Sequence, residues 1–166
     1  MIPMKKNLCF IAVIFLMFLF LGQTALAEPK LKYDFQYLFK WTASVMGIMI
    51  DPQKPRSALK FMSGDELQVF CEKKIGAKLR WKSEDGTIER NTYINAFYWP
   101  PDITVYMRND IPSEEESTEG LIVHEFVHYF QHIYSGFNKP SLERENEAQV
   151  IERKFCREHG FPVPGM

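Results

Sequence analysis

Cysteine is scarce, neither sign of charge prevails and no internal repeat is visible in this sequence of 166 residues. The 20 Lys and Arg residues against 21 Asp and Glu residues leave a formal net charge of −1. This balance argues against a protein that binds nucleic acid or anionic membranes through bulk charge. Cys9 lies in an apolar N-terminal segment, so only Cys71 and Cys156 remain elsewhere. A disulfide-dense mini-protein is excluded, whereas one Cys71–Cys156 disulfide and two buried free thiols both stay open.

A long hydrophobic run occurs only at the N-terminus. Lys5 and Lys6 precede the apolar stretch 8–21, and the segment ends in the small-residue pattern at 25–27. The stretch is shorter than the roughly 18 to 20 residues that a membrane span needs. We therefore predict a secretory signal peptide over residues 1–27. Residues 28–166 would be periplasmic or secreted, without a stable membrane span, and they are long enough for one domain.

Patterns along residues 28–166 predict an α+β fold. Apolar residues recur every three or four positions from Tyr33 to about Met49, which predicts a helix. A short strand over 58–62 precedes a second helix, for which Ser63 and Glu66 form a capping box and Gly76 a stop. The stretch 78–107 alternates polar with β-branched or aromatic residues, which predicts a small, mostly antiparallel sheet. In this stretch, Asp85-Gly86 supplies a turn and Ile103–Met107 reads as the last strand.

Two helices are predicted to close the chain. One runs from about Ser117 to Tyr134, after a capping box of Ser113 and Glu116, and the other runs from Ser141 to His159. The first helix is predicted to stop at Ser135-Gly136, and only residues 137–140 connect it to the start of the second. Helices joined so tightly usually pack as antiparallel neighbours.

The first of these helices contains the pattern His124-Glu125-x-x-His128. Histidines four residues apart on a helix lie on the same face, so both imidazoles can reach one zinc ion. Glu125 would sit beside the metal. There it can take a proton from a zinc-bound water that attacks a carbonyl, and then pass the proton to the leaving nitrogen.

The surroundings of this pattern favour a metal site. At 100° per residue, His124, Glu125, His128, Gln131 and His132 fall on one arc, and apolar residues cover the rest of the helix. A polar seam in a mostly buried helix is costly unless something binds it, and a metal does so. The alternative is an ordinary helix whose histidines face solvent or bond to neighbours.

A catalytic zinc needs a third protein ligand. His132 does not fit the extended form of the motif, because Gln131 and Tyr134 occupy the positions of its glycine and its third histidine. We predict Glu145 as the third ligand, since it falls on the inward arc of the last helix. Glu147 is the second choice, and a solvated helix charge is the alternative for Glu145.

The segment His124-Glu125-Phe126-Val127-His128, followed by Glu145-x-x-Ala148, resembles the gluzincin clan of zinc metallopeptidases, particularly its minimal single-domain members. It also looks like small exported bacterial proteins of unassigned substrate that share the pattern. The resemblance covers roughly 103–155 and implies a zincin-like domain that binds Zn²⁺ through His124, His128 and Glu145.

The resemblance carries two further implications. The strand before the motif helix, here Ile103–Met107, would line the cleft and pair with an extended peptide or protein substrate. The clan often has an aspartate four residues after the ligand glutamate, to orient the first histidine. This chain has Gln149 there, whose amide can still accept the imidazole N–H.

The predicted function is therefore a zinc-dependent peptidase or amide hydrolase with Glu125 as general base and acid. The alternative is an exported, zinc-stabilised binding or structural domain without turnover. No motif identifies the residue that stabilises the transition state, and the candidates left open are Tyr93, Tyr98, Tyr106, Tyr129, His132 and His159.

Overall fold

The computed structural model describes residues 29–75, 80–82, 88–90, 94–111 and 117–165. The predicted signal peptide, the stop at Gly76, the Asp85-Gly86 turn, Tyr93 and the Ser113–Glu116 capping box lie outside these ranges. The elements are, in chain order, α2 (Phe35–Val45), β1 (Ala58–Met62), α3 (Gly64–Ile75), β2 (Arg80–Lys82), β3 (Ile88–Arg90), β4 (Ala96–Trp99), the 3-10 turn η1 (Pro100–Asp102), β5 (Thr104–Arg108), α4 (Thr118–Ser135) and α5 (Ser141–His159). The predicted α+β class is confirmed.

The main sheet is mixed and has the strand order β1-β5-β4. β4 pairs antiparallel with β5, as expected for neighbours in sequence, but β1 pairs with β5 in parallel. The prediction of a mostly antiparallel sheet missed this parallel strand, because the pairing joins segments more than 40 residues apart with α3 between them. β2 and β3 form a separate antiparallel pair.

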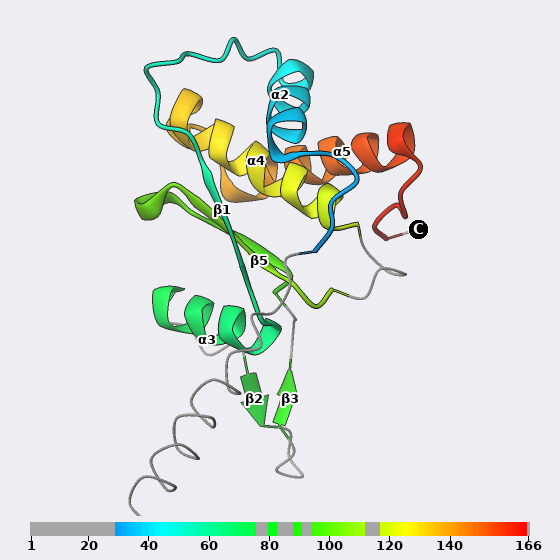
Figure 1. Cartoon of the computed structure of the whole chain (residues 1–166). Coiled ribbons are helices and arrows are strands. Elements are labelled where there is room, and N and C mark those ends of the chain that lie inside the picture. Colours follow the sequence, from blue (N-terminus) through cyan, green and yellow to red (C-terminus); the bar gives the residue numbers. More distant parts are fainter. Residues whose placement is uncertain (1–28, 76–79, 83–87, 91–93, 112–116, 166) are drawn as a thin grey trace, which may run out of the picture.

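The central strand β5 divides the core into two parts. Val105 and Met107 are fully buried in the main core cluster, together with residues of α2, α4 and α5. Tyr106, on the opposite face of the strand, belongs to a smaller cluster with Leu67 and Cys71 of α3. Figure 1 shows the same arrangement, with α2, α4 and α5 on one side of the strands and α3 on the other.

The capping residues fix where the helices begin and end. The side chain of Ser117 accepts a hydrogen bond from the backbone N–H of Gly120 and starts α4, and Gly136 ends it in the left-handed conformation at φ 60°. At α3, the Glu66 carboxylate accepts from the Ser63 backbone N–H at 2.9 Å, which confirms the predicted capping box.

α4 and α5 form the helix pair that carries the predicted site. They lie side by side and run in opposite directions, as the short connection predicted (Figure 1). Their contact brings small residues together, because a Cβ atom on Gly120 of α4 would lie only 2.8 Å from the Cys156 Sγ of α5. Ala148 of α5 is fully buried in the same core.

Cys71 and Cys156 are buried free thiols, which decides between the two alternatives that the sequence left open. Cys71 packs in the small cluster under β5, whereas Cys156 packs in the main cluster on the other face of the sheet. Burial raises the pKa of Cys71 to about 12 and that of Cys156 to about 11, so both stay protonated thiols at neutral pH.

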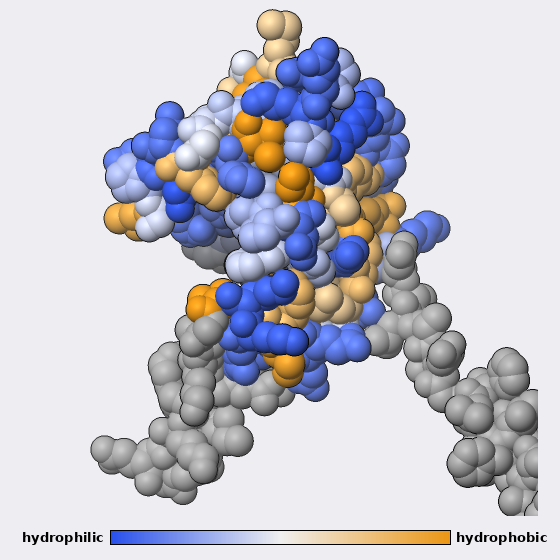
Figure 2. All heavy atoms as spheres, turned by 90° about the vertical axis from the view of Figure 1, so that its left-hand side faces the viewer, coloured by the Kyte–Doolittle hydropathy of each residue, from blue (hydrophilic) through white to orange (hydrophobic). Residues whose placement is uncertain are grey.

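Hydrophilic residues cover much of the face in Figure 2, and apolar residues occupy smaller patches of it. Among the residues that the structure describes, no helix combines the length and the apolar character that a bilayer crossing requires.

We predict that Gly120→Ala destabilises the protein by about 1 kcal/mol. Overpacking against Cys156 costs roughly 1 to 3 kcal/mol, which exceeds the gain of up to about 1 kcal/mol from alanine as a better helix former. Urea unfolding of both proteins measures the change. The control is the Cys156→Ala background, where the clash is gone and Gly120→Ala should be neutral or stabilising. The same loss in both backgrounds would contradict the assignment of the close contact.

Candidate metal centre

The structure brings together the three residues that the sequence predicted as metal ligands. His124 and His128 lie one turn apart on α4, and Glu145 reaches them from α5. The His124 Nε2 atom lies 3.2 Å from Glu145 Oε1, and the His128 Nε2 atom lies 3.3 Å from Glu145 Oε2. One ligand atom from each of the three residues falls within 4.8 Å of the other two, so the group can hold a metal ion.

Glu147, the second choice, points elsewhere. Its Oε2 accepts a hydrogen bond from Gln131 Nε2 at 3.1 Å and pairs with Lys139 Nζ at 2.9 Å. The geometry therefore separates the two glutamates that the sequence left as alternatives.

Both histidines are held at the ring nitrogen that faces away from the cluster. The His124 Nδ1 atom lies 2.9 Å from Glu152 Oε2, and the His128 Nδ1 atom lies 2.9 Å from Gln131 Oε1. In the neutral imidazole an acceptor at Nδ1 favours the tautomer that carries its proton there, so that Nε2 has the lone pair that a metal would bind.

The orienting role expected of Gln149 belongs to Glu152. Gln149 instead donates from Nε2 to Glu145 Oε1 at 3.3 Å. Glu152, which the sequence reasoning missed, is only 5% exposed. Its signal was the spacing of seven residues from Glu145, since positions two helical turns apart share one face. A carboxylate makes the His124 imidazole a more basic ligand than an amide would.

Gln131 connects His128 to α5 through hydrogen bonds. Its Nε2 donates to the backbone carbonyl of Arg144 at 3.0 Å as well as to Glu147. Gln131 is 3% exposed, and these bonds satisfy both ends of its buried amide.

Glu125 stands beside the three-residue group and does not belong to it. It is 7% exposed, and its Oε2 accepts a 2.7 Å hydrogen bond from the backbone N–H of Tyr98 in β4. Burial raises the pKa of its carboxyl above the usual value, although His124, His128 and the Tyr98 N–H act in the opposite direction.

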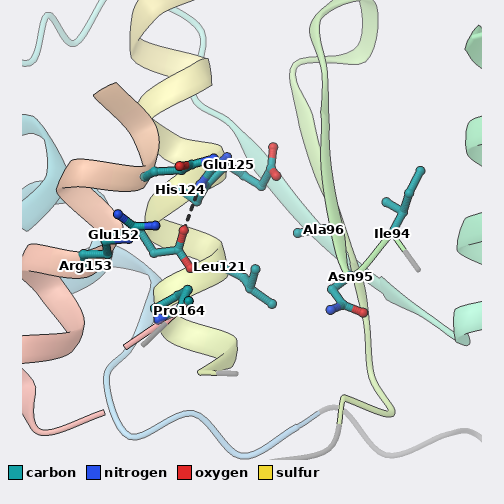
Figure 3. A pocket seen from close by; sticks show the side chains of 11 residues that line it. Ile94, Asn95, Ala96, Leu121, His124, Glu125, Glu152, Arg153 and Pro164 are labelled. Carbon is teal, nitrogen blue, oxygen red and sulfur yellow. Dashed lines mark hydrogen bonds and ion pairs between the residues drawn. The ribbon is translucent and has the colours of Figure 1, made fainter. Parts of the chain in front are cut away.

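A cleft runs along the candidate metal ligands. It has two lobes, and Ile94, Ala96, His124 and Glu125 line both of them. The Arg144 lobe, about 460 Å³, also contains His128, Phe137, Ser141 and Glu145. The Arg153 lobe, about 350 Å³, also contains Leu121, Glu152 and Pro164. Figure 3 shows the Arg153 lobe, with residues 94–96 on one wall and His124, Glu152 and Arg153 on the opposite wall.

The strand at the cleft is β4, so the expectation that Ile103–Met107 pairs with substrate is wrong. β5, which covers most of that range, is paired on both sides and buried. β4 pairs only with β5 in the described sheet, and the Tyr98 N–H points away from β5 toward Glu125. Because alternate residues of a strand present their backbone groups to the same side, Ala96 also faces outward.

The candidates for the transition-state donor mostly lie elsewhere. The Tyr106 hydroxyl donates to Asp102, the Tyr129 hydroxyl donates to the Pro55 carbonyl, and His159 contacts Tyr37. Tyr98 lines the Arg144 lobe, but it is 4% exposed and its hydroxyl lies 3.0 Å from His132 Nδ1. Arg144, which also lines that lobe, was not among the candidates.

Comparisons with protein-family models, with curated proteins and with solved structures find no match for this chain. The resemblance to gluzincins therefore depends on the motif residues alone.

We predict that Glu152→Ala lowers zinc affinity by roughly 10- to 100-fold, the usual cost of losing a partner that orients a metal-binding histidine. Gln149→Ala is the matched variant one turn away on α5, and it should lower the affinity only a few-fold. Competition with a chromogenic chelator measures both affinities, after circular dichroism has shown that each variant is folded. Equal losses in the two variants would contradict the assignment to Glu152.

The pKa of His124 predicts a proton release on metal binding. Burial alone would lower this pKa, but the hydrogen bond to Glu152 and the charges of Glu125, Glu152 and Glu145 outweigh it and raise the pKa from 6.5 to about 9. In the apoprotein the extra proton stabilises the fold fully below pH 6.5, and this contribution is lost as the pH rises through about 9.

Zinc should therefore displace about one proton from His124 near pH 7, and fewer as the pH approaches 9. Titration calorimetry in buffers of different ionisation enthalpy measures the release. Glu152→Gln removes a charge that raises the pKa, so this variant should release fewer protons near pH 7. A release independent of pH would show that His124 is neutral before the metal binds.

Proposed function

We propose that this protein is an exported zinc-dependent peptidase or related amide hydrolase, in which His124, His128 and Glu145 hold the metal. The observation that carries the proposal is Glu125, a buried carboxylate next to the three ligands that is not itself one of them. A purely structural zinc site has no use for such a group, whereas hydrolysis requires a base beside the metal.

The donor set fits zinc. Two imidazole nitrogens and one carboxylate oxygen are typical of catalytic zinc sites, which leave a further position open. The partners Glu152 and Gln131 hold the histidine rings with Nε2 toward Glu145. Bound there, Zn²⁺ would supply Lewis-acid chemistry that polarises a carbonyl and makes water more acidic.

Glu125 is suited to move the proton. The Tyr98 N–H fixes one oxygen of its carboxylate, while Oε1 makes no hydrogen bond within the described part of the chain. A raised pKa brings a carboxyl closer to neutral pH, where it can accept a proton from water and then return it to the leaving nitrogen.

The outward edge of β4 is the natural place for an extended substrate. Backbone groups of Ala96 face the same side as the Tyr98 N–H, and both residues line the cleft. A peptide that adds to this edge would place its backbone beside Glu125 and the two histidines.

Elemental analysis of the protein without residues 1–27 tests the metal site. We expect about one zinc per chain in the wild type and none in Glu145→Ala. Glu147→Ala is the matched control on the same helix, and it should keep the zinc because Glu147 bonds to Gln131 and Lys139 instead. A folded wild-type protein without zinc would refute the proposal.

Turnover separates the hydrolase from the zinc-stabilised binding domain. Glu125→Gln should retain the zinc and the bond from Tyr98, because the amide oxygen can still accept, but lose roughly 10²- to 10⁴-fold in rate on a peptide mixture. Mass spectrometry of the products measures cleavage. If the zinc-loaded wild type cleaves nothing, the binding domain is the better description. Unchanged turnover in Glu125→Gln would refute the assigned role of Glu125.

A further inference from the structure

Arg144 lines the lobe of the cleft that contains Glu145, and it also lines a separate pocket beside Gln131 and Glu147. Its guanidinium lies over the Phe137 ring, with 4.3 Å from Cζ to the ring centroid. Its Nη1 donates to the carbonyls of Phe137 and Lys139 at 3.4 and 3.2 Å. These contacts hold the head group at the connection between α4 and α5, which lowers the entropy lost when a ligand binds to it.

The remaining donors of Arg144 are chemically able to bind a carboxylate. Within the described residues, Nε and Nη2 make no hydrogen bond, and no carboxylate pairs with the guanidinium. Glu147, the nearby acidic residue on α5, is bonded to Gln131 and Lys139. Parallel N–H groups of one guanidinium edge bind a carboxylate in a bidentate manner, which a lysine cannot imitate.

The start of α5 adds to the attraction for an anion. Ser141, the first residue of α5, lines the same lobe as Arg144. The preceding residue is Pro140, which supplies no side-chain cap, so the first N–H groups of this 19-residue helix lack that partner. The positive end of the helix dipole and the guanidinium therefore act on the same space.

From this arrangement we propose that Arg144 selects substrates with a carboxylate on the side of the cleft that contains Glu145. The proposal rests on the proposed peptidase function and deepens it by naming a substrate class. The carboxylate belongs to an Asp or Glu side chain or to a free C-terminus, since both present the same group to the guanidinium.

A cleavage profile tests this selection. Peptide mixtures that contain Glu or Gln at otherwise matched positions, each with a free or an amidated C-terminus, are cleaved by the zinc-loaded protein and sequenced by mass spectrometry. We expect the wild type to prefer a carboxylate on one side of the cleaved bond by roughly five- to tenfold. Arg144→Gln should lose this preference. Faster cleavage of Glu peptides than of Gln peptides identifies a side-chain carboxylate. Faster cleavage of peptides with free C-termini than of amidated ones identifies the C-terminal carboxylate.

Two matched arginines on α5 serve as controls. Arg157 is exposed in the last turn and lies outside both lobes, so Arg157→Gln should leave activity and preference unchanged. Arg153 lines the other lobe, so Arg153→Gln should keep the preference that depends on Arg144. Cleavage without a carboxylate preference, or a preference that survives in Arg144→Gln, would overturn the selection and leave the peptidase function intact.

A binding measurement separates failure of this inference from failure of the peptidase function. Fluorescein-labelled versions of the same four mixtures are titrated into the zinc-loaded Glu125→Gln variant, with and without Arg144→Gln, and fluorescence anisotropy reports affinity. We expect five- to tenfold tighter binding of the carboxylate-bearing mixtures only when Arg144 is present. Equal binding of all four mixtures would refute the selection even if the protein cleaves nothing.

Discussion

The docking of α5 against α4 is the contact on which the site depends. The polar seam of α4 lines the cleft and is mostly buried, and unpaired polar groups there would be costly. α5 supplies the partners, with Glu145 between the two histidines, Glu152 behind His124 and the Arg144 carbonyl for Gln131. Without α5 these seam residues would lose these partners, whereas Glu125 and His132 have theirs in Tyr98 of β4.

Small residues allow α4 and α5 to approach each other closely. Gly120 has no side chain where the Cys156 thiol lies, and Ala148 is buried in the same core. A short connection of residues 137–140 holds the start of α5 near the end of α4, so Glu145 reaches the histidines after little more than one turn. Local chain geometry and side-chain size thus place the three candidate ligands, whereas Glu125, the proposed base, is fixed by a different element, the strand β4.

Local sequence patterns correctly predicted features that depend on residues close together in the chain. Ser63 with Glu66 and Gly136 marked helix ends, strand 58–62 was bounded correctly, and the His124–His128 spacing predicted two imidazoles on one face. Glu145 could be ranked above Glu147 from the inward arc of α5. The choice between Gln149 and Glu152 depended on the rotation of α5 against α4, which a wheel drawn for one helix does not contain. The parallel pairing of β1 with β5 was also missed, because strand neighbours are set by contacts distant in sequence. The identity of the strand at the cleft was missed for that reason too.

The positions of the two thiols have a consequence for how the chain reaches this fold. Cys71 and Cys156 are buried in different core clusters on opposite faces of the central strand, so no bridge between them is compatible with the native packing. Formation of the core therefore requires no oxidising step, and a disulfide formed between them during folding would trap a non-native topology. Folding in an oxidising compartment would expose the chain to this error until burial has withdrawn both sulfur atoms from solvent.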